Sequence, residues 1–302
     1  MSGIEIVEVS PRDGLQNEKR IVSTADKVAL IERAVAAGVR RIEVASFVHP
    51  GRVPQMADAE AVCEALPATF EATAIGLVLN RRGAERALAT RVDELGAVAC
   101  ATDGFGLANQ GRTSDQTVDD AIEIIRLARA AGRSAQVTIS VAFGCPFEGE
   151  VPASRVAAMA RRLAEAGPRE IAFGDTIGVA TPDQVAQMIT FVRLAVPNMP
   201  LRMHFHDTRN TAIANAWTAY LGGAATLDAS IGGCGGCPYA PGASGNVATE
   251  DVLYLLRRAE VETGIDIETI TNTVPWLEER IGRLLPGRQS KVAKFPRQEG
   301  KS

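Results

Sequence analysis

The chain has little of what membrane-spanning, secreted and nucleic-acid-binding proteins are rich in. Its 302 residues include only five scattered cysteines, which do not suggest a disulfide framework. The net charge of −4 gives no reason to expect nucleic acid or anionic lipid as a partner. No apolar run is long enough to span a membrane, and the N-terminus carries no basic secretory or transit segment. We therefore expect a reduced, cytoplasmic protein without nucleic-acid or membrane partners.

Histidine is scarce too, since the chain has three, and two of them lie one residue apart. His204 and His206 end the apolar run 199–206, which is typical of a buried strand. Because side chains alternate along a strand, both imidazoles project from the same face. Neutral imidazole is a common metal ligand, so the pair forms half of a metal site. Two core histidines bonded to backbone groups are the alternative.

Short β-rich runs alternate with amphipathic helical patterns along the chain. The predicted strands cover residues 4–9, 41–47, 72–79, 95–101, 136–143, 170–175, 201–206 and 226–231. Predicted helices between them include 24–37, 117–131, 152–166, 182–196 and 211–221. Eight such units without a long linker imply a parallel sheet, and a closed α/β (β/α)8 TIM barrel fits this length best. An open doubly wound sheet is the alternative, disfavoured because no Gly-x-Gly-x-x-Gly opens the first helix.

One domain accounts for most of the chain. We expect a barrel with a C-terminal helical extension over residues 1–285 and a polar, basic tail over residues 286–302. The extra helices begin near Asp266, beyond the eight units. Basic residues near the end, such as Arg283 and Lys291, are candidates for phosphate contacts, with a solvated tail as the alternative.

Polar residues crowd the strand ends, where barrel enzymes place their chemistry. Asp13, after the first strand, is either a carboxylate ligand facing the histidine pair or a turn residue. Its neighbour Arg12 is suited to a carboxylate, a phosphate or an oxyanion, unless it only forms an ion pair. Glu43 lies within an apolar strand and needs a partner, for which Arg12 is the obvious choice. Asp175 ends the sixth strand, as a general base or as a cap or histidine-orienting group.

A long glycine-rich loop, residues 232–246, follows the eighth strand and is typical of a lid. It contains Cys237, a candidate proton donor or nucleophile. The spacing of Cys234 and Cys237 also suggests zinc or redox chemistry, but the second cysteine pair of a zinc ribbon is missing. At the end of the loop, Asn246 either caps the helix that begins near Ala248 or offers its amide oxygen to the metal.

Seven segments of the chain occur in the order and with the spacings of one known family. They are Pro11-Arg-Asp-Gly-Leu-Gln-Asn-Glu-Lys19, Ile42-Glu-Val-Ala-Ser-Phe-Val48, Val53-Pro-Gln-Met-Ala-Asp58, Gly174-Asp-Thr-Ile-Gly178, His204-Phe-His-Asp-Thr208, Gly235-Gly-Cys-Pro-Tyr-Ala240 and Gly242-Ala-Ser-Gly-Asn-Val-Ala-Thr-Glu-Asp251. Together they closely resemble hydroxymethylglutaryl-CoA lyase, within the wider group of metal-dependent barrel lyases and Claisen-type synthases. The resemblance runs from the first strand to about residue 256.

The resemblance implies a metal-dependent lyase that cleaves 3-hydroxy-3-methylglutaryl-CoA to acetyl-CoA and acetoacetate by a retro-Claisen reaction. The implied metal is Mg²⁺ or Mn²⁺, and its implied ligands are Asp13, His204, His206 and Asn246. Gln16 and Glu250 are implied to support the site. In the implied reaction Asp175 is the base, Arg12 stabilises the thioester oxygen, Cys237 protonates the enolate carbon and Glu43 holds Arg12.

The departures from the family pattern concern the acyl partner and not the reaction type. Asn210 stands where relatives usually carry glycine, Cys234 is an added thiol, and Leu107 and Ala108 replace lysines found in some relatives. The same chemistry on citramalyl-CoA or on a longer branched 3-hydroxyglutaryl-CoA is therefore the alternative. A condensing synthase and a metal-binding barrel without catalysis are further alternatives. The expected partner is an acyl-CoA substrate, and a homo-oligomer, dimer or tetramer, is expected.

Overall fold

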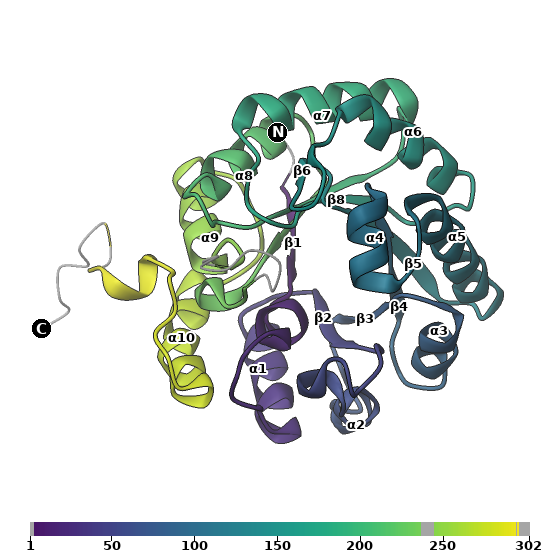
Figure 1. Cartoon of the computed structure of the whole chain (residues 1–302). Helices are drawn as coiled ribbons and strands as arrows, with labels where there is room; N and C mark the ends of the chain where they lie inside the picture. The colour runs from purple at the N-terminus through teal and green to yellow at the C-terminus, as the bar shows by residue number, and fades with distance from the viewer. Residues whose placement is uncertain (1–2, 237–244, 294, 296–302) are drawn as a thin grey trace, which may run out of the picture.

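Eight parallel strands close into a barrel in the order β1, β2, β3, β4, β5, β8, β9, β10, with helices around it (Figure 1). The computed structural model describes residues 3–236, 245–293 and 295. The strands are β1 Glu5–Glu8, β2 Arg41–Ser46, β3 Thr73–Val78, β4 Glu94–Cys100, β5 Ser134–Ser140, β8 Ile171–Asp175, β9 Leu201–Phe205 and β10 Thr226–Ala229. The predicted TIM barrel is thus confirmed, and each predicted strand overlaps one of the eight.

One predicted strand ends earlier than the apolar pattern indicates. The run 136–143 continues past Ser140, but Val141 adopts a φ of 50°, a left-handed conformation that turns the chain out of the sheet. The chain then forms a small antiparallel hairpin from β6 (Gly144–Cys145) and β7 (Gly149–Glu150), which the sequence pattern did not predict. Because it follows β5, this hairpin lies at the carboxyl end of the barrel.

Six of the ten α-helices in the described part of the chain begin at a side-chain cap. The helix predicted over 117–131 begins earlier, at Ser114, because Thr113 and Gln116 form a capping box. A second capping box, of Thr181 and Gln184, starts the helix predicted from residue 182. The α-helices are α1 Thr24–Ala36, α2 Ala59–Ala65, α3 Arg81–Leu88, α4 Asp103–Gln110, α5 Ser114–Ala130, α6 Ala153–Ala164, α7 Pro182–Ala195, α8 Ala212–Leu221, α9 Thr249–Arg258 and α10 Ile267–Ile281.

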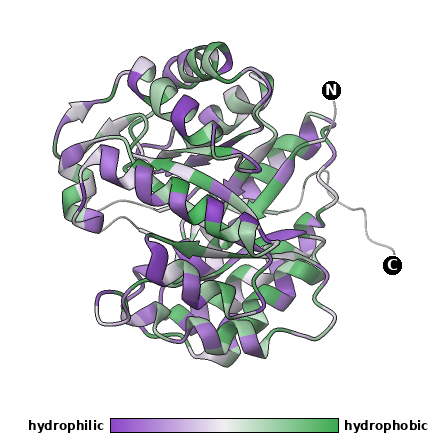
Figure 2. Ribbon diagram, turned by 90° about the vertical axis from the view of Figure 1, so that its right-hand side faces the viewer, coloured by the Kyte–Doolittle hydropathy of each residue, from purple (hydrophilic) through white to green (hydrophobic). Residues whose placement is uncertain are grey.

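The apolar core lies between the strand ring and the helices, which alternate hydrophobic and hydrophilic residues around it (Figure 2). The barrel interior, in contrast, holds buried charges, among them Arg41, Arg202 and Glu43. None of the described helices is long and apolar enough to cross a membrane.

The C-terminal extension is attached to the barrel and does not lead straight into solvent. Past α10, the backbone N–H of Gly287 donates to the carbonyl of Gly232, 2.9 Å away. The backbone N–H groups of Arg288 and Gln289 donate to the carboxylate of Asp251. The first part of the predicted tail therefore packs on the loop that follows β10. The extra helices predicted after Asp266 are, among the described residues, α10 and one short 3₁₀ turn, Gln289–Lys291.

Candidate active site

The carboxyl ends of β1 and β9 bring Asp13, His204 and His206 together. One potential ligand atom from each residue lies within 4.8 Å of the others. The two imidazole rings, from one face of β9 as predicted, have centroids 5.1 Å apart. Oδ2 of Asp13 lies 3.8 Å from Nε2 of His206, because a π-helical turn, η1 (Ser10–Gly14), places Asp13 above the end of β1. Three of the four predicted metal ligands are thus preassembled.

Asn246, the fourth predicted ligand, lies against the same group. Its backbone pairs with His206, and its Nδ2 donates to Oδ2 of Asp13 at 2.8 Å. Its Oδ1 is buried and has no hydrogen-bond partner within the described part of the chain. Gly235 permits this placement, because a Cβ there would lie 2.6 Å from Nδ2 of Asn246 and its φ is +137°. Asn246 does not cap α9, whose N-cap is Ala248.

The donor set fits a divalent cation. It offers imidazole nitrogen, carboxylate oxygen and amide oxygen, a mixture that suits Mg²⁺, Mn²⁺ or a related ion. Like Oδ1 of Asn246, Nδ1 of His206 is buried without a partner, and these two atoms are among eleven such side-chain atoms in the described part of the chain. Two of them fall in this one cluster of metal-ligating side chains, where a bound ligand would satisfy buried polar groups.

Asp228, in β10, contacts the predicted ligand His204 and was not among the residues that the sequence predicted. Its Oδ2 lies 3.0 Å from Nδ1 of His204, so the carboxylate accepts the Nδ1–H and leaves Nε2 as the ligand atom. Burial alone would raise the pKa of Asp228, but Arg202 and His204 outweigh it and hold that pKa below its usual value. The signal was a carboxylate inside an apolar strand, the same signal that singled out Glu43.

Arg12 and Glu43 form the expected ion pair beside the metal-ligand group. Nε of Arg12 donates to Oε2 of Glu43 at 2.7 Å, and Nη1 donates to Oδ1 of Asp13 at 2.5 Å. The side chain of Arg12 is 11% exposed, so the guanidinium keeps a face toward the barrel mouth. The other carboxylate oxygen of Glu43 accepts from Arg202 at 2.9 Å. The carboxylates of Glu43 and Asp13 therefore hold Arg12 in place before any ligand binds.

A column of buried charges continues down the barrel interior from this layer. Arg202 also contacts Asp228, and Arg41 contacts Glu94 at 2.5 Å and Glu170 at 2.8 Å. Three guanidinium groups thus face five carboxylates, which leaves two negative charges unmatched when the histidines are neutral. The arginines are Arg12, Arg41 and Arg202, and the carboxylates are Asp13, Glu43, Glu94, Glu170 and Asp228. A divalent cation carries the charge that this column lacks.

Asp175 lies buried at the end of β8, as predicted, and anchors the loop that follows. Its Oδ1 accepts the backbone N–H of Val179 at 2.8 Å, and its Oδ2 accepts that of Ala180 at 3.1 Å. Burial raises the pKa of Asp175 despite these bonds. The carboxylate oxygens have lone pairs left over, so the anchoring bonds leave room for a proton-accepting role.

The two predicted supporting residues are Glu250 and Gln16. Glu250, in the first turn of α9, accepts the backbone N–H of Gly232 at 2.9 Å, and burial raises the pKa of Glu250 to about 8. It therefore braces the loop after β10. Gln16 lies half-buried in the turn after η1.

Only one of the two loop cysteines lies within the described residues. The thiol of Cys234 is buried, and its Sγ lies 3.7 Å from Oε1 of Glu18. Burial raises the pKa of this thiol well above its usual value, so Cys234 stays protonated and unreactive. Glu18 is in turn paired with Arg283, one of the basic residues considered for phosphate contacts, so Arg283 already has a protein partner. Cys237, the predicted proton donor, lies outside the described residues.

The rim of the barrel mouth is apolar near α4. Leu107, which replaces a lysine of some relatives, is 56% exposed on this helix, and Phe147 of the β6–β7 hairpin is 52% exposed. The backbone N–H of Gly104 donates to Glu148 at 2.6 Å and ties the helix to the hairpin. Figure 1 shows α4 on the mouth side of the barrel with the helices α3 and α5 beside it.

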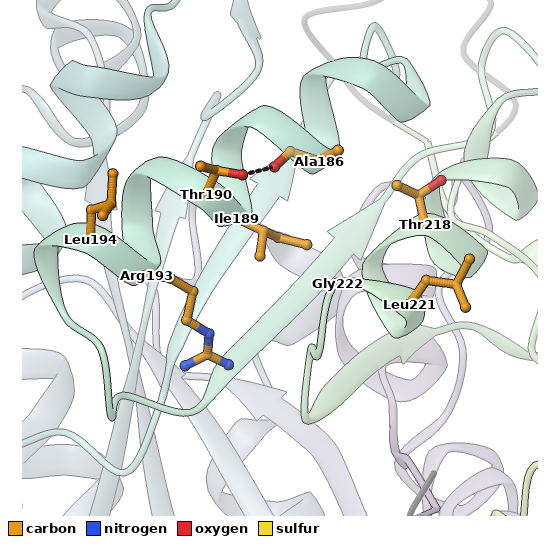
Figure 3. Close-up of a pocket in the computed structure, with 8 residues that line it drawn as sticks. All are labelled: Ala186, Ile189, Thr190, Arg193, Leu194, Thr218, Leu221 and Gly222. Atoms are coloured by element: carbon orange, nitrogen blue, oxygen red, sulfur yellow. Dashed lines mark hydrogen bonds between the residues drawn. The ribbon is translucent and has the colours of Figure 1, made fainter.

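A groove separate from the barrel mouth lies on the outside of the barrel, between α7 and α8 (Figure 3). It has a volume of about 600 Å³ and an apolar lining that includes Ile189, Leu194 and Leu221. It lies near the C-terminal ends of both helices, which face the opposite end of the barrel from the mouth. Its cation, Arg193, is bonded to backbone carbonyls, among them that of Met199 at 2.8 Å. The groove therefore has no part in the chemistry at the mouth.

Comparison with known proteins gives relatives that match almost the whole chain. The family model described as HMGL-like matches residues 3–275. An (R)-citramalyl-CoA lyase from Chloroflexus aurantiacus is 42% identical over 95% of this chain and 93% of its own. A 3-hydroxy-3-isohexenylglutaryl-CoA/hydroxymethylglutaryl-CoA lyase from Pseudomonas aeruginosa is 41% identical over 89% of this chain and 90% of its own.

Solved structures agree with these matches. A hydroxymethylglutaryl-CoA lyase from Pseudomonas aeruginosa superimposes with a TM-score of 0.92 at 39% identity, over 96% of this chain and 97% of its own. A hydroxymethylglutaryl-CoA lyase from Acinetobacter baumannii, in complex with coenzyme A and 3-methylmalate, gives a TM-score of 0.91 at 35% identity, over 97% and 96%. The chain therefore belongs to the HMGL-like family, and it is a carbon–carbon lyase of the hydroxymethylglutaryl-CoA lyase type that acts on acyl-CoA.

Proposed function

We propose that the protein cleaves 3-hydroxy-3-methylglutaryl-CoA to acetyl-CoA and acetoacetate with Mg²⁺ or Mn²⁺ as cofactor. The observation that carries the proposal is the cluster of Asp13, His204 and His206 with Arg12 fixed beside it. Relatives named for this reaction support the choice of substrate. The complex of one such relative with coenzyme A supports an acyl-CoA ligand.

In this proposal Asp13, His204, His206 and Asn246 hold the cation, with Asp228 orienting His204. A divalent cation held there would supply Lewis acidity that lowers the pKa of the 3-hydroxyl of the substrate. Gln16 and Glu250 support this end of the site. His204 lies on β9, His206 and Asn246 pair with each other at its end, and Asp13 lies in the η1 turn after β1, so rigid elements set most of the geometry.

The chain's own groups move the protons. Asp175 accepts the hydroxyl proton, and the electron pair left on oxygen forms the ketone of acetoacetate as the carbon–carbon bond breaks. The pair from that bond becomes the enolate of acetyl-CoA, whose oxygen Arg12 stabilises while Glu43 holds Arg12. Cys237 then donates a proton to the enolate carbon and completes acetyl-CoA.

Citramalyl-CoA is the second candidate substrate. The 42% identical relative named for that substrate favours it, and the exposed apolar side chain of Leu107 at the mouth is consistent with a different acyl group. The same groups serve both substrates, because in each the hydroxyl is on one of the two carbons joined by the bond that breaks. A longer branched 3-hydroxyglutaryl-CoA is the third, supported by the isohexenyl substrate named for the Pseudomonas aeruginosa relative.

The test is release of acetyl-CoA from each of the three thioesters, with added Mn²⁺ or Mg²⁺. We expect metal-dependent turnover of 3-hydroxy-3-methylglutaryl-CoA that collapses in Cys237→Ala and persists in Cys63→Ala, a buried cysteine of α2. If only citramalyl-CoA or only the isohexenyl thioester were cleaved, that thioester would replace 3-hydroxy-3-methylglutaryl-CoA as the proposed substrate. Full activity of Cys237→Ala would remove Cys237 from the mechanism.

We also propose that the protein is a cytoplasmic homo-oligomer, a dimer or tetramer. Light scattering on the purified full chain measures the mass directly. A single species of the monomer's mass at micromolar concentration would contradict this part of the proposal.

A further inference from the structure

Arg202 occupies the centre of the charged column inside the barrel. It lies on β9 two positions before His204, and its side chain is completely buried. Nη2 donates to Oε1 of Glu43 at 2.9 Å, and Nε donates to Oδ1 of Asp228. A single guanidinium therefore holds one oxygen of each of these two carboxylates.

The second oxygen of each carboxylate reaches the reaction site. Oε2 of Glu43 accepts from Nε of Arg12, the cation at the mouth, at 2.7 Å. Oδ2 of Asp228 lies 3.0 Å from Nδ1 of His204, a predicted metal ligand. Neither carboxylate is able to rotate without breaking a bond to Arg202, because both of its oxygens are engaged.

We propose that Arg202 is a positioning residue that fixes the orientation of Arg12 and His204 together. It acts through Glu43 on the substrate side and through Asp228 on the metal side. A planar guanidinium suits this role, since its donors form a rigid fork that bridges two acceptors. The inference deepens the proposed function and rests on its metal site.

Arg41 provides a matched control within the same column. Its side chain is 1% exposed, and it pairs with Glu94 at 2.5 Å and Glu170 at 2.8 Å. Its third partner is Glu5, toward the amino end of the strands and away from the mouth. Replacing Arg41 therefore removes an equally buried charge and leaves in place Glu43 and Asp228, which hold Arg12 and His204. Among the described residues, the two arginines share only Glu170, which lies 3.7 Å from Nη1 of Arg202.

The experiment measures Mn²⁺ binding to the metal-free full chain, from the electron paramagnetic resonance signal of free Mn²⁺. We expect Arg202→Met to weaken Mn²⁺ binding about 10- to 100-fold, as loss of a group behind a metal ligand does. We expect Arg41→Met to bind Mn²⁺ within about threefold of wild type. Equal weakening in the two variants would overturn the inference, because the effect would then follow from lost buried charge alone.

Arg202→Lys separates charge from geometry. Lysine keeps the buried positive charge, but its ammonium is a point charge that does not reproduce the planar fork. We expect Arg202→Lys to fold and still to bind Mn²⁺ at least about tenfold more weakly than wild type. If Arg202→Lys bound Mn²⁺ within twofold of the wild-type affinity, the inference that Arg202 bridges the two carboxylates would be overturned.

Two partner variants test the two branches separately, and they apply even where Arg202→Met does not fold. We expect Asp228→Asn to weaken Mn²⁺ binding, whereas Glu43→Gln lowers turnover and leaves Mn²⁺ binding within about threefold. Uniform effects of both variants on Mn²⁺ binding would contradict the two-branch arrangement. Wild type that binds no Mn²⁺ would overturn the metal site and this inference together. Wild type that binds Mn²⁺ but cleaves none of the thioesters would overturn the proposed substrates and leave the binding test of Arg202 intact.

Discussion

At the scale of single residues, Arg12 shows how the barrel prepares a charge before substrate arrives. Burial alone would lower the pKa of Arg12, but Glu43 and Asp13 outweigh it and raise that pKa, so the side chain is a permanent cation. The same two carboxylates fix its position. In the proposed reaction, a cation held in place would need no reorganisation as negative charge develops on the substrate, and this preorganisation would lower the barrier.

We expect Arg12→Met to lower kcat by about 10²- to 10³-fold, or about 3–4 kcal/mol of transition-state stabilisation. Mn²⁺ binding should stay within about threefold of wild type, because the donor atoms are unchanged. Steady-state kinetics and Mn²⁺ titration of the same preparation test both parts. If the loss in kcat were recovered by saturating Mn²⁺, Arg12 would act only by holding Asp13.

The pH dependence of metal binding belongs to His204. Burial alone would lower the pKa of His204, but the bond to Asp228 and the charge of Asp13 outweigh it and raise that pKa. A raised pKa stabilises the metal-free fold at low pH, and this stability is lost as pH rises through the folded-state pKa. The metal needs the neutral ring, so protons and metal compete.

We therefore expect the apparent Mn²⁺ affinity to fall with decreasing pH, by about tenfold per unit below the pKa of His204. Asp228→Asn should move the midpoint of this fall to lower pH, because it removes the group that raises the pKa. Mn²⁺ titrations between about pH 5.5 and 8 measure the midpoint. The same midpoint in both proteins would show that Asp228 does not set the pKa of His204.

At the scale of elements, α9 begins with a buried acid that costs stability at neutral pH. Burial raises the pKa of Glu250 to about 8. Its contribution to stability is fully present below the unfolded-state pKa, near 4.5, and is lost as pH rises toward 8, because only the unfolded chain ionises there. Its bond to Gly232 nevertheless joins the start of α9 to the loop after β10.

We expect Glu250→Gln to raise the free energy of unfolding, by little at pH 5 and by about 3 kcal/mol at pH 8. Glutamine keeps the acceptor for Gly232 and removes the ionisation. Urea denaturation at the two pH values tests this. Glu85→Gln, on the exposed face of α3, is the control, and we expect it to leave the free energy of unfolding unchanged at both pH values. A destabilised Glu250→Gln at pH 8 would mean that the carboxylate is ionised in the folded protein.

The elements also show how far the sequence alone leads. Alternation and apolar runs predict all eight barrel strands, because each strand is buried on both faces and carries a continuous signal. The β6–β7 hairpin gives no such signal, since two residues per strand are too few for any periodicity. The turn at Val141 is invisible for another reason, because a β-branched residue disfavours the left-handed conformation it adopts.

In the site, the sequence predicts the residues that follow strand ends, and of those inside the barrel it predicts Glu43 but misses Asp228 and Arg202. Asp13, His204 and His206 follow or end strands, so the fold rule brings them together. Asp228 and Arg202 were missed because their partners depend on how distant segments are placed in the barrel: Asp228 meets His204 of the adjacent strand β9, and Arg202 meets Glu43 of β2. Arg202 meets Glu43, 159 positions away in the chain, and no local pattern encodes that pairing.

At the scale of the whole molecule, we expect the charged column to link metal binding to the stability of the fold. The five carboxylates of the column outnumber its three guanidiniums, and the surplus lies in the interior. Buried charge without a partner is costly, so the metal-free barrel carries strain that a bound divalent cation relieves. A ligand that binds only the folded state adds RT ln(1 + [L]/Kd) to its stability.

We expect Mn²⁺ or Mg²⁺ at a hundred times its Kd to raise the free energy of unfolding by about 2.7 kcal/mol, and a chelator to remove that gain. His206→Ala should lose the metal-dependent gain, because it removes a ligand. Asp175→Asn should keep it, because Asp175 is bonded to backbone amides and is not among the metal-binding group. Thermal unfolding with and without metal, at pH 7.5 and then near pH 5.5, measures the gain and its loss upon protonation of His204. If the metal-dependent gain in stability persisted in His206→Ala, the stabilising cation would be bound elsewhere on the molecule. If the gain were equal at pH 7.5 and pH 5.5, the cation would not be bound by the imidazoles.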